Sequence, residues 1–336
     1  MPIVTTEHFK NGSLPLSKNG IPQVSEDDYC RLKGYMLEKD DIVFSRVGSV
    51  DINAHVEQVQ QGWLFSGRVL RVRPIKSVNS LCLHYVLSTE SVKRDIRNRA
   101  VGQTMPSINT PILSNTGIYM SQSEVEQKKI ASLLSLIDER IATQNKIIDK
   151  LQSLIRGIRN DVFGKFRKSV GVNAMVGDVL SYEQPQPYIV EDTEYTAEGI
   201  PVLTANKAFV LGYTSETDGI YDKGDCIIFD DFTLDCKYVD FPFKVKSSAI
   251  KILTAKDKEL LRYTFEFMKY LDLSTDEHKR HYIAETQNQE LFLPTAQVVR
   301  TIAHAFSALS SRMKTVTKQR DMFELQKQYL LRQMFI

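Results

Sequence analysis

The sequence predicts an α+β protein of two strand-rich modules, each followed by a long helix. Three observations support this prediction. A helical segment occurs twice, both copies carry apolar residues at heptad spacing, and short β-branched segments recur in the same order ahead of each copy. Such self-similarity indicates a tandem repeat of one structural unit.

The repeat is clearest in the helical segments. Residues 130–163, IASLLSLIDERIATQNKIIDKLQSLIRGIRNDVF, align without a gap on residues 302–335. Eight of the 34 positions are identical, so the shared spacing of apolar residues is the stronger evidence. Apolar residues follow each other at steps of four and three, which predicts that each helix packs its seam against a partner helix. The other copy is the natural partner.

The predicted seam is broken by a few polar residues. Gln144 interrupts the first copy, and Arg320 and Lys327 interrupt the second, as polar residues do where they fix the register of a coiled coil. The apolar seam residues are Ile130, Leu134, Ile137, Ile141, Ile148, Leu151, Ile155 and Ile158 in the first copy, and Ile302, Phe306, Leu309, Met313, Val316, Phe323, Leu330 and Met334 in the second.

The strand segments repeat as well. The matching pairs are 2–6 with 201–205, 38–46 with 223–231, and 65–72 with 245–252. The segments between these pairs differ in length and composition. Similar strands with different loops are typical of one scaffold that carries two different recognition surfaces.

These repeats set the predicted boundaries. We expect a first module at 1–122, a helix at 123–163, a linker at 164–176, a second module at 177–292 and a second helix at 293–336. About 25 residues precede PVLTA in the second module, whereas only Met1 precedes PIVTT in the first. The first module is therefore expected to lack its opening strand.

Composition limits the class of protein. Hydrophobic residues make up 42% and charged residues 25% of the chain, and the net charge is +2. No apolar run is long enough to cross a membrane, and the N-terminus has no signal-peptide core, so we expect a cytoplasmic protein. The cysteines lack the paired spacing of a zinc site and are expected to be reduced thiols. They are Cys30, Cys82, Cys226 and Cys236.

The sequence carries no recognisable catalytic motif. It lacks a Walker loop, since 219–226 has Asp where a Lys is required, and it has neither GxSxG nor HExxH. The histidines do not stand at ligand or triad spacing. The acidic segment 229–237 crowds its aspartates as turn residues do, rather than spreading them as a nuclease site would. We therefore expect no catalytic residue, metal or cofactor in this chain.

Several segments together point to a family. They are DIVFSRVGSV (41–50), GWLFSGRVLRVRP (62–74), VGQTMPSINT (101–110), EVEQKKIASLLSLIDERI (124–141) and most of 200–253. In combination they resemble the specificity (S) subunit of type I restriction-modification enzymes, over nearly the whole chain. The second helix departs from the pattern, because TAQVVRTIAHAFSAL lacks the EQ-like opening of the first.

The resemblance implies a function. The modules would be target recognition domains, each reading one half of a bipartite site in double-stranded DNA. The helices would be conserved spacers packed as an antiparallel coiled coil, which bind methyltransferase (M) subunits, two per S subunit. S-adenosylmethionine would be bound by the M subunits and DNA cleavage performed by restriction (R) subunits, as part of phage defence.

DNA contacts require cationic or amide side chains in loops that reach a groove. Arg46 is the strongest single candidate for contacting a base, whereas Trp63 is expected in the core. The candidates are His8, Lys10, Asn11, Ser45, Arg46, Ser49, Gln103 and Thr104 in the first module, and Asn206, Lys207, Asp231, Thr233, Lys237, Tyr238, Lys244, Lys246, Lys279 and Arg280 in the second.

Two alternatives stay open at this point. The chain could be a coiled-coil adaptor that binds only protein, or a stand-alone nuclease. Salt-dependent DNA binding separates the leading hypothesis from the adaptor, because phosphate contacts release counterions. Metal-dependent cleavage by the isolated chain would indicate the nuclease.

Overall fold

The computed structural model describes residues 1–335 except 10–11, 206–207, 274 and 276–279. The chain divides into two compact units, each built from two helical stretches and one strand-rich module. The first unit comprises Met1–Asn145 and Lys318–Ile336, and the second comprises Lys146–Thr317. The described part of the chain contains no helix with both the length and the hydropathy that a membrane span needs.

The first unit has a three-stranded antiparallel sheet in the order β3-β2-β5 and a parallel pair β1-β4. All four residues of β2 are buried, which explains its continuous β-branched and aromatic sequence. The strands are β1 (Ile3–Val4), β2 (Ile42–Ser45), β3 (Asn53–His55), β4 (Leu64–Phe65) and β5 (Val69–Val72), and the helices are α1 (Glu26–Arg31), α2 (Ser80–Leu87), α3 (Glu90–Arg99) and α4 (Thr110–Ser114).

The second unit repeats this arrangement, and its main antiparallel sheet has one strand more. Its antiparallel sheet has the order β11-β10-β13-β7, and β8 pairs in parallel with β12, as β1 does with β4. The elements are β6 (Ala174–Met175), α6 (Val176–Val179), β7 (Leu180–Glu183), β8 (Ile200–Leu203), β9 (Val210–Thr214), β10 (Cys226–Asp230), β11 (Cys236–Val239), β12 (Lys244–Val245), β13 (Ile250–Ala255), α7 (Lys258–Leu271) and β14 (Glu290–Leu291).

The sheet register corrects one detail of the sequence alignment. Pairing 65–72 with 245–252 made Val72 the counterpart of Ile252. In the sheets, however, Val72 lies opposite Ile42, and Leu253 lies opposite Ile227, the counterpart of Ile42. Strand β5 therefore corresponds to β13 displaced by one residue, and the side-chain faces match only in this register.

The long helices are α5 (Glu124–Ser169) and α8 (Ala296–Met334). Helix α5 continues past the predicted end at residue 163, so the first part of the predicted linker 164–176 is helical. The physical reason is packing, because Phe163 is fully buried and Phe166 packs on the same core cluster of the second unit. Helix α8 begins slightly later than the expected residue 293.

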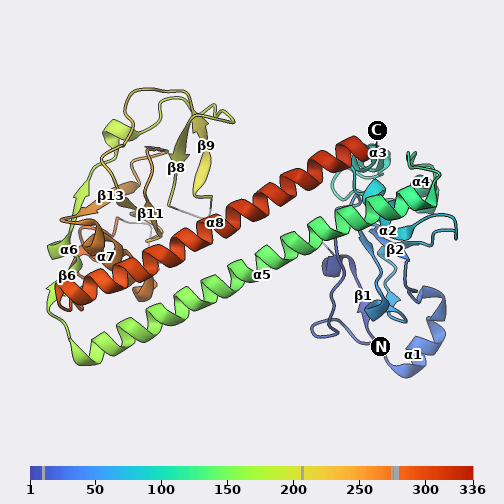
Figure 1. The fold of residues 1–336 in the computed structure, drawn as a ribbon, viewed down its shortest axis with the longest axis horizontal. Coiled ribbons are helices and arrows are strands. Elements are labelled where there is room, and N and C mark those ends of the chain that lie inside the picture. Colours follow the sequence, from blue (N-terminus) through green and yellow to red (C-terminus); the bar gives the residue numbers. More distant parts are fainter. Residues whose placement is uncertain (10–11, 206–207, 274, 276–279, 336) are drawn as a thin grey trace. The chain divides into compact units, whose positions relative to one another are not determined.

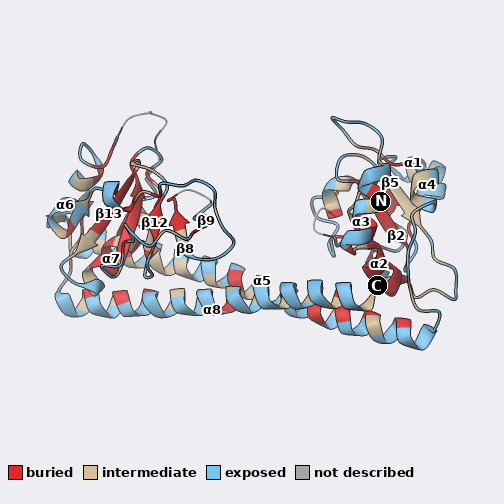
Figure 2. Ribbon diagram, turned by 90° about the horizontal axis from the view of Figure 1, so that it is seen from above, coloured by how far each residue is buried: buried red, intermediate tan, exposed pale blue. Residues whose placement is uncertain are grey.

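Within the first unit the two helices run in opposite directions. Leu134 shares a core cluster with Leu331, and one turn away the carboxylate of Asp138 lies 2.6 Å from the ammonium of Lys327. Every predicted seam residue is buried or half-buried, whereas most residues between them are exposed (Figure 2). Lys327, one of the polar residues that interrupt the apolar seam, is thus paired with Asp138 of the other helix.

Buried residues otherwise concentrate in the modules. In Figure 1 the strands of each unit lie against short helices, and each unit includes a stretch of both long helices. Trp63 is 1% exposed in the core of the first unit, as expected from the sequence. The described strands are short, so much of each module consists of the loops that connect them.

Candidate DNA interface

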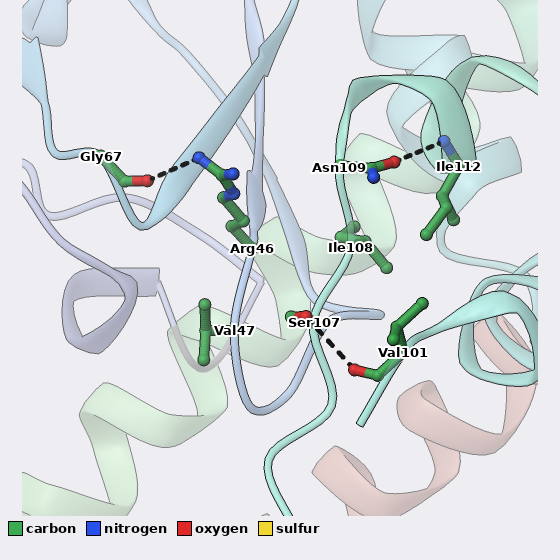
Figure 3. A pocket seen from close by; sticks show the side chains of 8 residues that line it. All are labelled: Arg46, Val47, Gly67, Val101, Ser107, Ile108, Asn109 and Ile112. Atoms are coloured by element: carbon green, nitrogen blue, oxygen red, sulfur yellow. Dashed lines mark hydrogen bonds between the residues drawn. The ribbon is translucent and has the colours of Figure 1, made fainter. Parts of the chain in front are cut away.

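Arg46 lies at the centre of three loops of the first unit. Its backbone amide donates to the carbonyl of Arg68 (2.9 Å), and its carbonyl accepts from the amide of Ile108 (2.9 Å). These bonds join the end of β2 to the turn before β5 and to the segment before α4. The Arg46 side chain is exposed at this junction, where Figure 3 shows its guanidinium donating to the carbonyl of Gly67 (3.3 Å).

A hollow of about 380 Å³ opens beside Arg46. Its wall combines the guanidinium with backbone groups and aliphatic side chains, so it can offer both a hydrogen-bond donor and apolar contact. Such a combination suits the edge of a base more than a bare phosphate, which needs only charge. The lining residues are Arg46, Val47, Gly67, Val101, Ser107, Ile108, Asn109 and Ile112.

A short loop projects beside this hollow. Val101 and Ser107 exchange both backbone hydrogen bonds (2.9 and 2.8 Å), and the amide of Gly48 donates to the carbonyl of Pro106 (2.8 Å). Gly102 has a φ of +102°, and a Cβ there would lie 2.8 Å from the carbonyl oxygen of Met105, so the turn requires glycine. The fold therefore brings this loop next to the one that follows β2.

Four predicted residues of the first module lie on this surface. Arg46 and Ser49 are exposed after β2, and Gln103 and Thr104 are exposed at the tip of the projecting loop. We call this group of residues the Arg46 surface. The sequence did not show that residues about 60 positions apart would meet, because only the strand pairing brings them together.

Ser45 does not belong to the Arg46 surface. Its side chain is turned inward, since the residue is 3% exposed and its hydroxyl donates to the carbonyl of Val47 (3.0 Å). We therefore withdraw it as a DNA contact. His8 is half-buried, and its Nδ1 accepts from the amide of Thr5 (3.0 Å), which holds the ring in the turn that follows β1.

The counterpart of Arg46 in the second unit is Asp231. The equivalence rests on the same backbone bond, because the amide of Asp231 donates to the carbonyl of Ala249 (2.9 Å). Asp231 is only 1% exposed, and one carboxylate oxygen accepts from the amides of His281 (3.0 Å) and Tyr282 (2.7 Å). The structure therefore places the carboxylate of this predicted DNA contact inside the protein, where it has internal partners.

The carboxylate of Asp231 also faces two cations. Lys251 lies 3.7 Å away and is 1% exposed, and Arg280 lies 4.0 Å away at the surface. Burial lowers the pKa of Lys251 below its usual range, although the nearby carboxylate partly opposes this shift. The ammonium of Lys251 donates to Gln184 as well (2.9 Å), so the buried charge is both paired and hydrogen-bonded.

Two further predicted contacts of the second module are internal. Lys244 is 3% exposed, pairs with the carboxylate of Glu216 and donates to the carbonyl of Asp218 (2.8 Å). Tyr238 donates to the carboxylate of Asp225 (2.7 Å), and its half-buried ring lies under the guanidinium of Arg262. The polar groups of Lys244 and Tyr238 thus have partners inside the module.

The other predicted residues of the second module vary in position. Thr233, Lys246 and Arg280 are exposed, and Lys237 is half-buried on β11. The guanidinium of Arg280 lies 5.9 Å from the ring centre of Phe232, which is itself 37% exposed. Lys10, Asn11, Asn206, Lys207 and Lys279 lie outside the described residues.

The exposed predicted contacts in these loops are hydrogen-bonding and cationic groups. Among the described residues, no cluster of three or more histidines, cysteines or acidic residues could hold a metal ion. The cysteine thiols that the structure buries are Cys82, Cys226 and Cys236, and burial raises their pKa. Exposed cations and amides in loops on a rigid sheet are the groups that contact nucleic acid.

Comparisons with known proteins show which sequences this chain resembles. Residues 1–153 match the type I restriction modification DNA specificity domain. The chain is 44% identical over 126 residues to the Type I restriction enzyme EcoR124I/EcoR124II specificity subunit of Escherichia coli, covering 35% of this chain and 31% of that protein. Residues 1–153 are therefore similar to the DNA specificity domain of type I restriction-modification enzymes.

Two further specificity subunits are similar. A putative type I restriction enzyme MjaX specificity subunit of Methanocaldococcus jannaschii is 30% identical over 175 residues, covering 49% of this chain and 39% of that protein. This chain therefore aligns with less than half of the length of either curated relative. The S subunit structure from M. genitalium has a TM-score of 0.65 at 16% identity, covering 90% of this chain and 84% of that one, and so shares the fold.

In this chain, residues at equivalent positions of the two long helices contact the modules. Asp138 of α5 accepts from the hydroxyl of Tyr85 in α2 (2.8 Å), and burial raises the pKa of that tyrosine. The corresponding residue of α8, Ser310, bonds to Arg262 in α7. Both contacts join a module helix to the spacer by a polar bond beside apolar packing.

A buried charge cluster strengthens the second of these contacts. Glu266, 1% exposed, accepts from Arg262 (2.6 Å) and from Arg159 of α5 (2.6 Å). Arg262 also donates to the carbonyl of Phe306 (3.2 Å). Because every charge in the cluster has a partner, removing one would leave another uncompensated.

Sequence reasoning missed Arg68 and Phe232. Arg68 is exposed, and its carbonyl bonds to the amide of Arg46, so two arginines meet at the Arg46 surface. Phe232 lies beside Arg280 in the second unit. Arg68 follows Gly67, and a glycine of this kind indicates a turn in the sequence. Only the register of β2 with β5 shows that Arg68 lies next to Arg46.

Proposed function

We propose that this chain is the DNA-reading subunit of a type I restriction-modification complex and that the Arg46 surface reads one half of a bipartite site. The observation that carries the proposal is the exposed guanidinium of Arg46 at the mouth of an aliphatic-lined hollow, within the residues that match the specificity domain. Arginine is the side chain that most often recognises guanine, through two hydrogen bonds in the major groove.

The second unit is proposed to read the other half of the site with a different set of groups. Arg280, Thr233 and Phe232 are exposed after β10 and before β14, whereas the counterpart of Arg46 is buried. Two surfaces of unlike chemistry on related sheets would read unlike half-sites. This supports an asymmetric target rather than a palindromic one.

The long helices are proposed to set the distance between the half-sites. Helix α5 has 46 residues, which corresponds to about 70 Å at 1.5 Å per residue. Inserting one helical turn at matched positions of both helices is expected to lengthen the non-specific gap of the recognised site. An unchanged gap would contradict this part of the proposal.

Catalysis is proposed to come from partner subunits. Exposed apolar residues on the long helices could contact them, among them Leu136, Leu325 and Tyr329 at 58%, 70% and 62% exposure. We propose that two methyltransferase subunits, which would hold S-adenosylmethionine, dock on these helices, and that restriction subunits join the same complex. A coiled-coil adaptor would use the same apolar residues but would leave the Arg46 surface without a ligand.

The test is to coexpress the chain with its methyltransferase subunit and to map methylated sites by sequencing. Arg46→Ala is expected to relax discrimination at one base of one half-site, by about 1–3 kcal/mol, and to leave the other half-site unchanged. Arg31→Ala, which removes another exposed positive charge of the first module, paired with Asp28 of the same helix, is the control.

Two outcomes would contradict the proposal. Equal effects of both variants would mean that Arg46 contributes only charge. Methylation that stays unaltered in both half-sites after Arg46→Ala would remove the Arg46 surface from recognition. Binding of DNA by the purified complex should weaken steeply with salt, whereas a protein-only adaptor would show no such binding.

A further inference from the structure

A cation and an aromatic ring lie together on the surface of the second unit, beside the turn after β10. The guanidinium of Arg280 lies 5.9 Å from the ring centre of Phe232, and its Nη1 lies 4.0 Å from Oδ2 of Asp231. The Arg280 side chain is 51% exposed, whereas Asp231 is buried. A separation of 4.0 Å is longer than a hydrogen bond, so the N–H groups of Arg280 remain able to donate to a ligand.

The turn that carries Phe232 is fixed by internal contacts. One oxygen of the Asp230 carboxylate accepts from the backbone amides of Phe232 (2.9 Å) and Thr233 (3.0 Å), and the amide of Asp230 donates to the carbonyl of Asp235 (2.9 Å). Leu234 has a φ of +61°, which is unfavourable for leucine, and its side chain is 9% exposed in the core of the second unit. These contacts fix the backbone of Phe232 before any ligand binds.

The segment that carries Arg280 is attached to the same turn. The amide of His281 donates to the carbonyl of Asp231 (3.1 Å), as the amide of Ile108 does to the carbonyl of Arg46 in the first unit (2.9 Å). Both units therefore bring an exposed arginine to this junction. In the first unit the turn after the strand supplies it, and in the second unit the segment bonded to that turn supplies it.

The charges at the junction leave one cation at the surface. Oδ2 of Asp231 lies 3.7 Å from the Lys251 ammonium and 4.0 Å from the Arg280 guanidinium, so one acid faces two cations. The lysine is buried and needs the carboxylate as its counter-charge. The surplus positive charge therefore lies on the exposed guanidinium, where it complements an anionic ligand with hydrogen-bond acceptors.

The apolar neighbour of the arginine is also common to both units. The counterpart of Phe232 is Val47, because each follows the residue that forms the shared backbone bond, and Val47 lines the hollow beside Arg46. Each unit thus places an apolar side chain next to a guanidinium. The two apolar side chains differ in size and shape, so the bases that flank the one read by arginine are expected to differ between the half-sites.

We propose that Arg280 reads a guanine in the second half-site and that Phe232 and Asp231 are its positioning residues. This role rests on the proposed function, because it requires that the chain reads DNA. Guanine offers two acceptors in the major groove, O6 and N7, which match two parallel N–H donors of a guanidinium. A phosphate contact requires only charge, whereas the ring and the carboxylate restrict the orientation of the guanidinium, as two parallel hydrogen bonds require.

The test uses the complex of this chain with its methyltransferase subunit and DNA duplexes that carry the site found by methylation mapping. Each guanine of the half-site that Arg46→Ala leaves unchanged is replaced in turn by 7-deazaguanine, which lacks N7 and still pairs with cytosine. One replacement is expected to weaken binding by the wild-type complex about tenfold, because one of two hydrogen bonds is lost. The same replacement should weaken binding by the Arg280→Ala complex less than about twofold, because that complex has no donor for N7.

The positioning role of the ring is tested by two variants. Phe232→Tyr keeps the ring and should retain the tenfold effect of 7-deazaguanine, whereas Phe232→Ala should reduce it to about threefold. Denaturation followed by circular dichroism checks that both variants are folded. Arg300→Ala removes an exposed arginine of α8 in the same unit and should leave the effect of 7-deazaguanine unaltered.

Several outcomes would overturn this role of Arg280 while the proposed function stands, provided that Arg46→Ala still changes its own half-site. They are a second half-site without guanine, or equal effects of 7-deazaguanine on the wild-type and Arg280→Ala complexes at every guanine. Weaker binding of Arg280→Ala to all sequences alike would identify a phosphate contact and would also overturn it. An undiminished effect in Phe232→Ala would overturn the positioning role of the ring. Absence of sequence-specific DNA binding by the complex would overturn the proposed function as well.

Discussion

Arg46 and Asp231 occupy the same place in the two units and differ in almost every other respect. The backbone amide of Arg46 donates to the turn before β5, and that of Asp231 donates to the turn before β13, both over 2.9 Å. The arginine side chain is exposed beside a hollow, whereas the aspartate is buried against Lys251 and two backbone amides. The same position of the fold is therefore occupied by an exposed side chain in the first unit and by a buried one in the second.

The neighbouring strand explains the difference. Lys251 is 1% exposed on β13, and the corresponding residue of β5 is Leu70. A buried ammonium needs a partner, and an acid one position beyond β10 supplies it. Leu70 is uncharged and needs no counter-charge, so the position of Arg46 does not have to supply a buried acid. The chemistry of the strand beside it therefore decides what this loop position does.

Asp231→Ala is expected to give the largest effect. It would leave the Lys251 ammonium without its counter-charge and the backbone amide of Tyr282 without its acceptor, lowering the free energy of unfolding of the second unit by about 3–5 kcal/mol. Trp63, the sole tryptophan, lies in the first unit, so its fluorescence reports that unit. Circular dichroism in denaturant should show an early transition that tryptophan fluorescence does not.

The control for this change is Arg46→Ala, at the equivalent position. It should leave both transitions within about 0.5 kcal/mol of the wild type, because the residue is exposed. If both alanine variants unfold alike, the two positions do not differ in the way the contacts indicate.

Low pH is expected to lower the folding stability of the first unit, because the unfolded chain protonates His84 more readily than the folded chain does. This residue is 9% exposed, its Nδ1 lies 2.6 Å from Oδ1 of Asn53, and burial lowers its pKa to about 3. The unfolded chain binds a proton near pH 6.5 and the folded chain does not. Stability is therefore full above pH 6.5 and falls below it, by about 2 kcal/mol at pH 5.

Urea titrations followed by Trp63 fluorescence at pH 7 and pH 5 measure this loss. His84→Gln should reduce the pH dependence by about one proton, or 1.4 kcal/mol per pH unit. We assign the remaining pH dependence of stability to His55, because burial lowers the pKa of this residue as well. An unchanged slope in His84→Gln would exclude His84 as the titrating group.

The two long helices allow a smaller test. Gln144 and Val316 are equivalent in the repeat, and Oε1 of Gln144 is buried without a hydrogen-bond donor among the described residues. Val316 is fully buried. Gln144→Val is expected to raise the midpoint of denaturation, by about 1 kcal/mol, and Val316→Gln to lower it by a similar or larger amount. A stability loss in Gln144→Val would show that the glutamine has a partner in the folded chain.

Much of the fold followed from spacing alone. The α+β class and the two helices were predicted from the repeat, and heptad spacing needs no knowledge of the partner because a helix seam is local in sequence. The end of α5 was placed too early, since Phe163 and Phe166 extend the helix through contacts with distant residues. Helix ends of this kind depend on tertiary packing.

The candidate site was less predictable. Arg46, Ser49, Gln103 and Thr104 are exposed at one surface, but Ser45, Asp231, Lys244 and Tyr238 are held by internal partners. Residue type indicates which groups can contact DNA, but only strand register and burial show which ones are free to do so. Sequence repeats cannot reveal this, because a one-residue shift exchanges the two faces of a strand.

The division of the long helices between the units has a consequence for synthesis on the ribosome. The first unit needs residues 318–335 of α8, whereas the second unit ends at Thr317. A chain made from its N-terminus therefore completes the second unit before the first, although the first module emerges earlier. Until residues 318–335 have been synthesised, Leu134 and Tyr85 lack their contact with Leu331, so the nascent first module exposes apolar surface that a chaperone can bind.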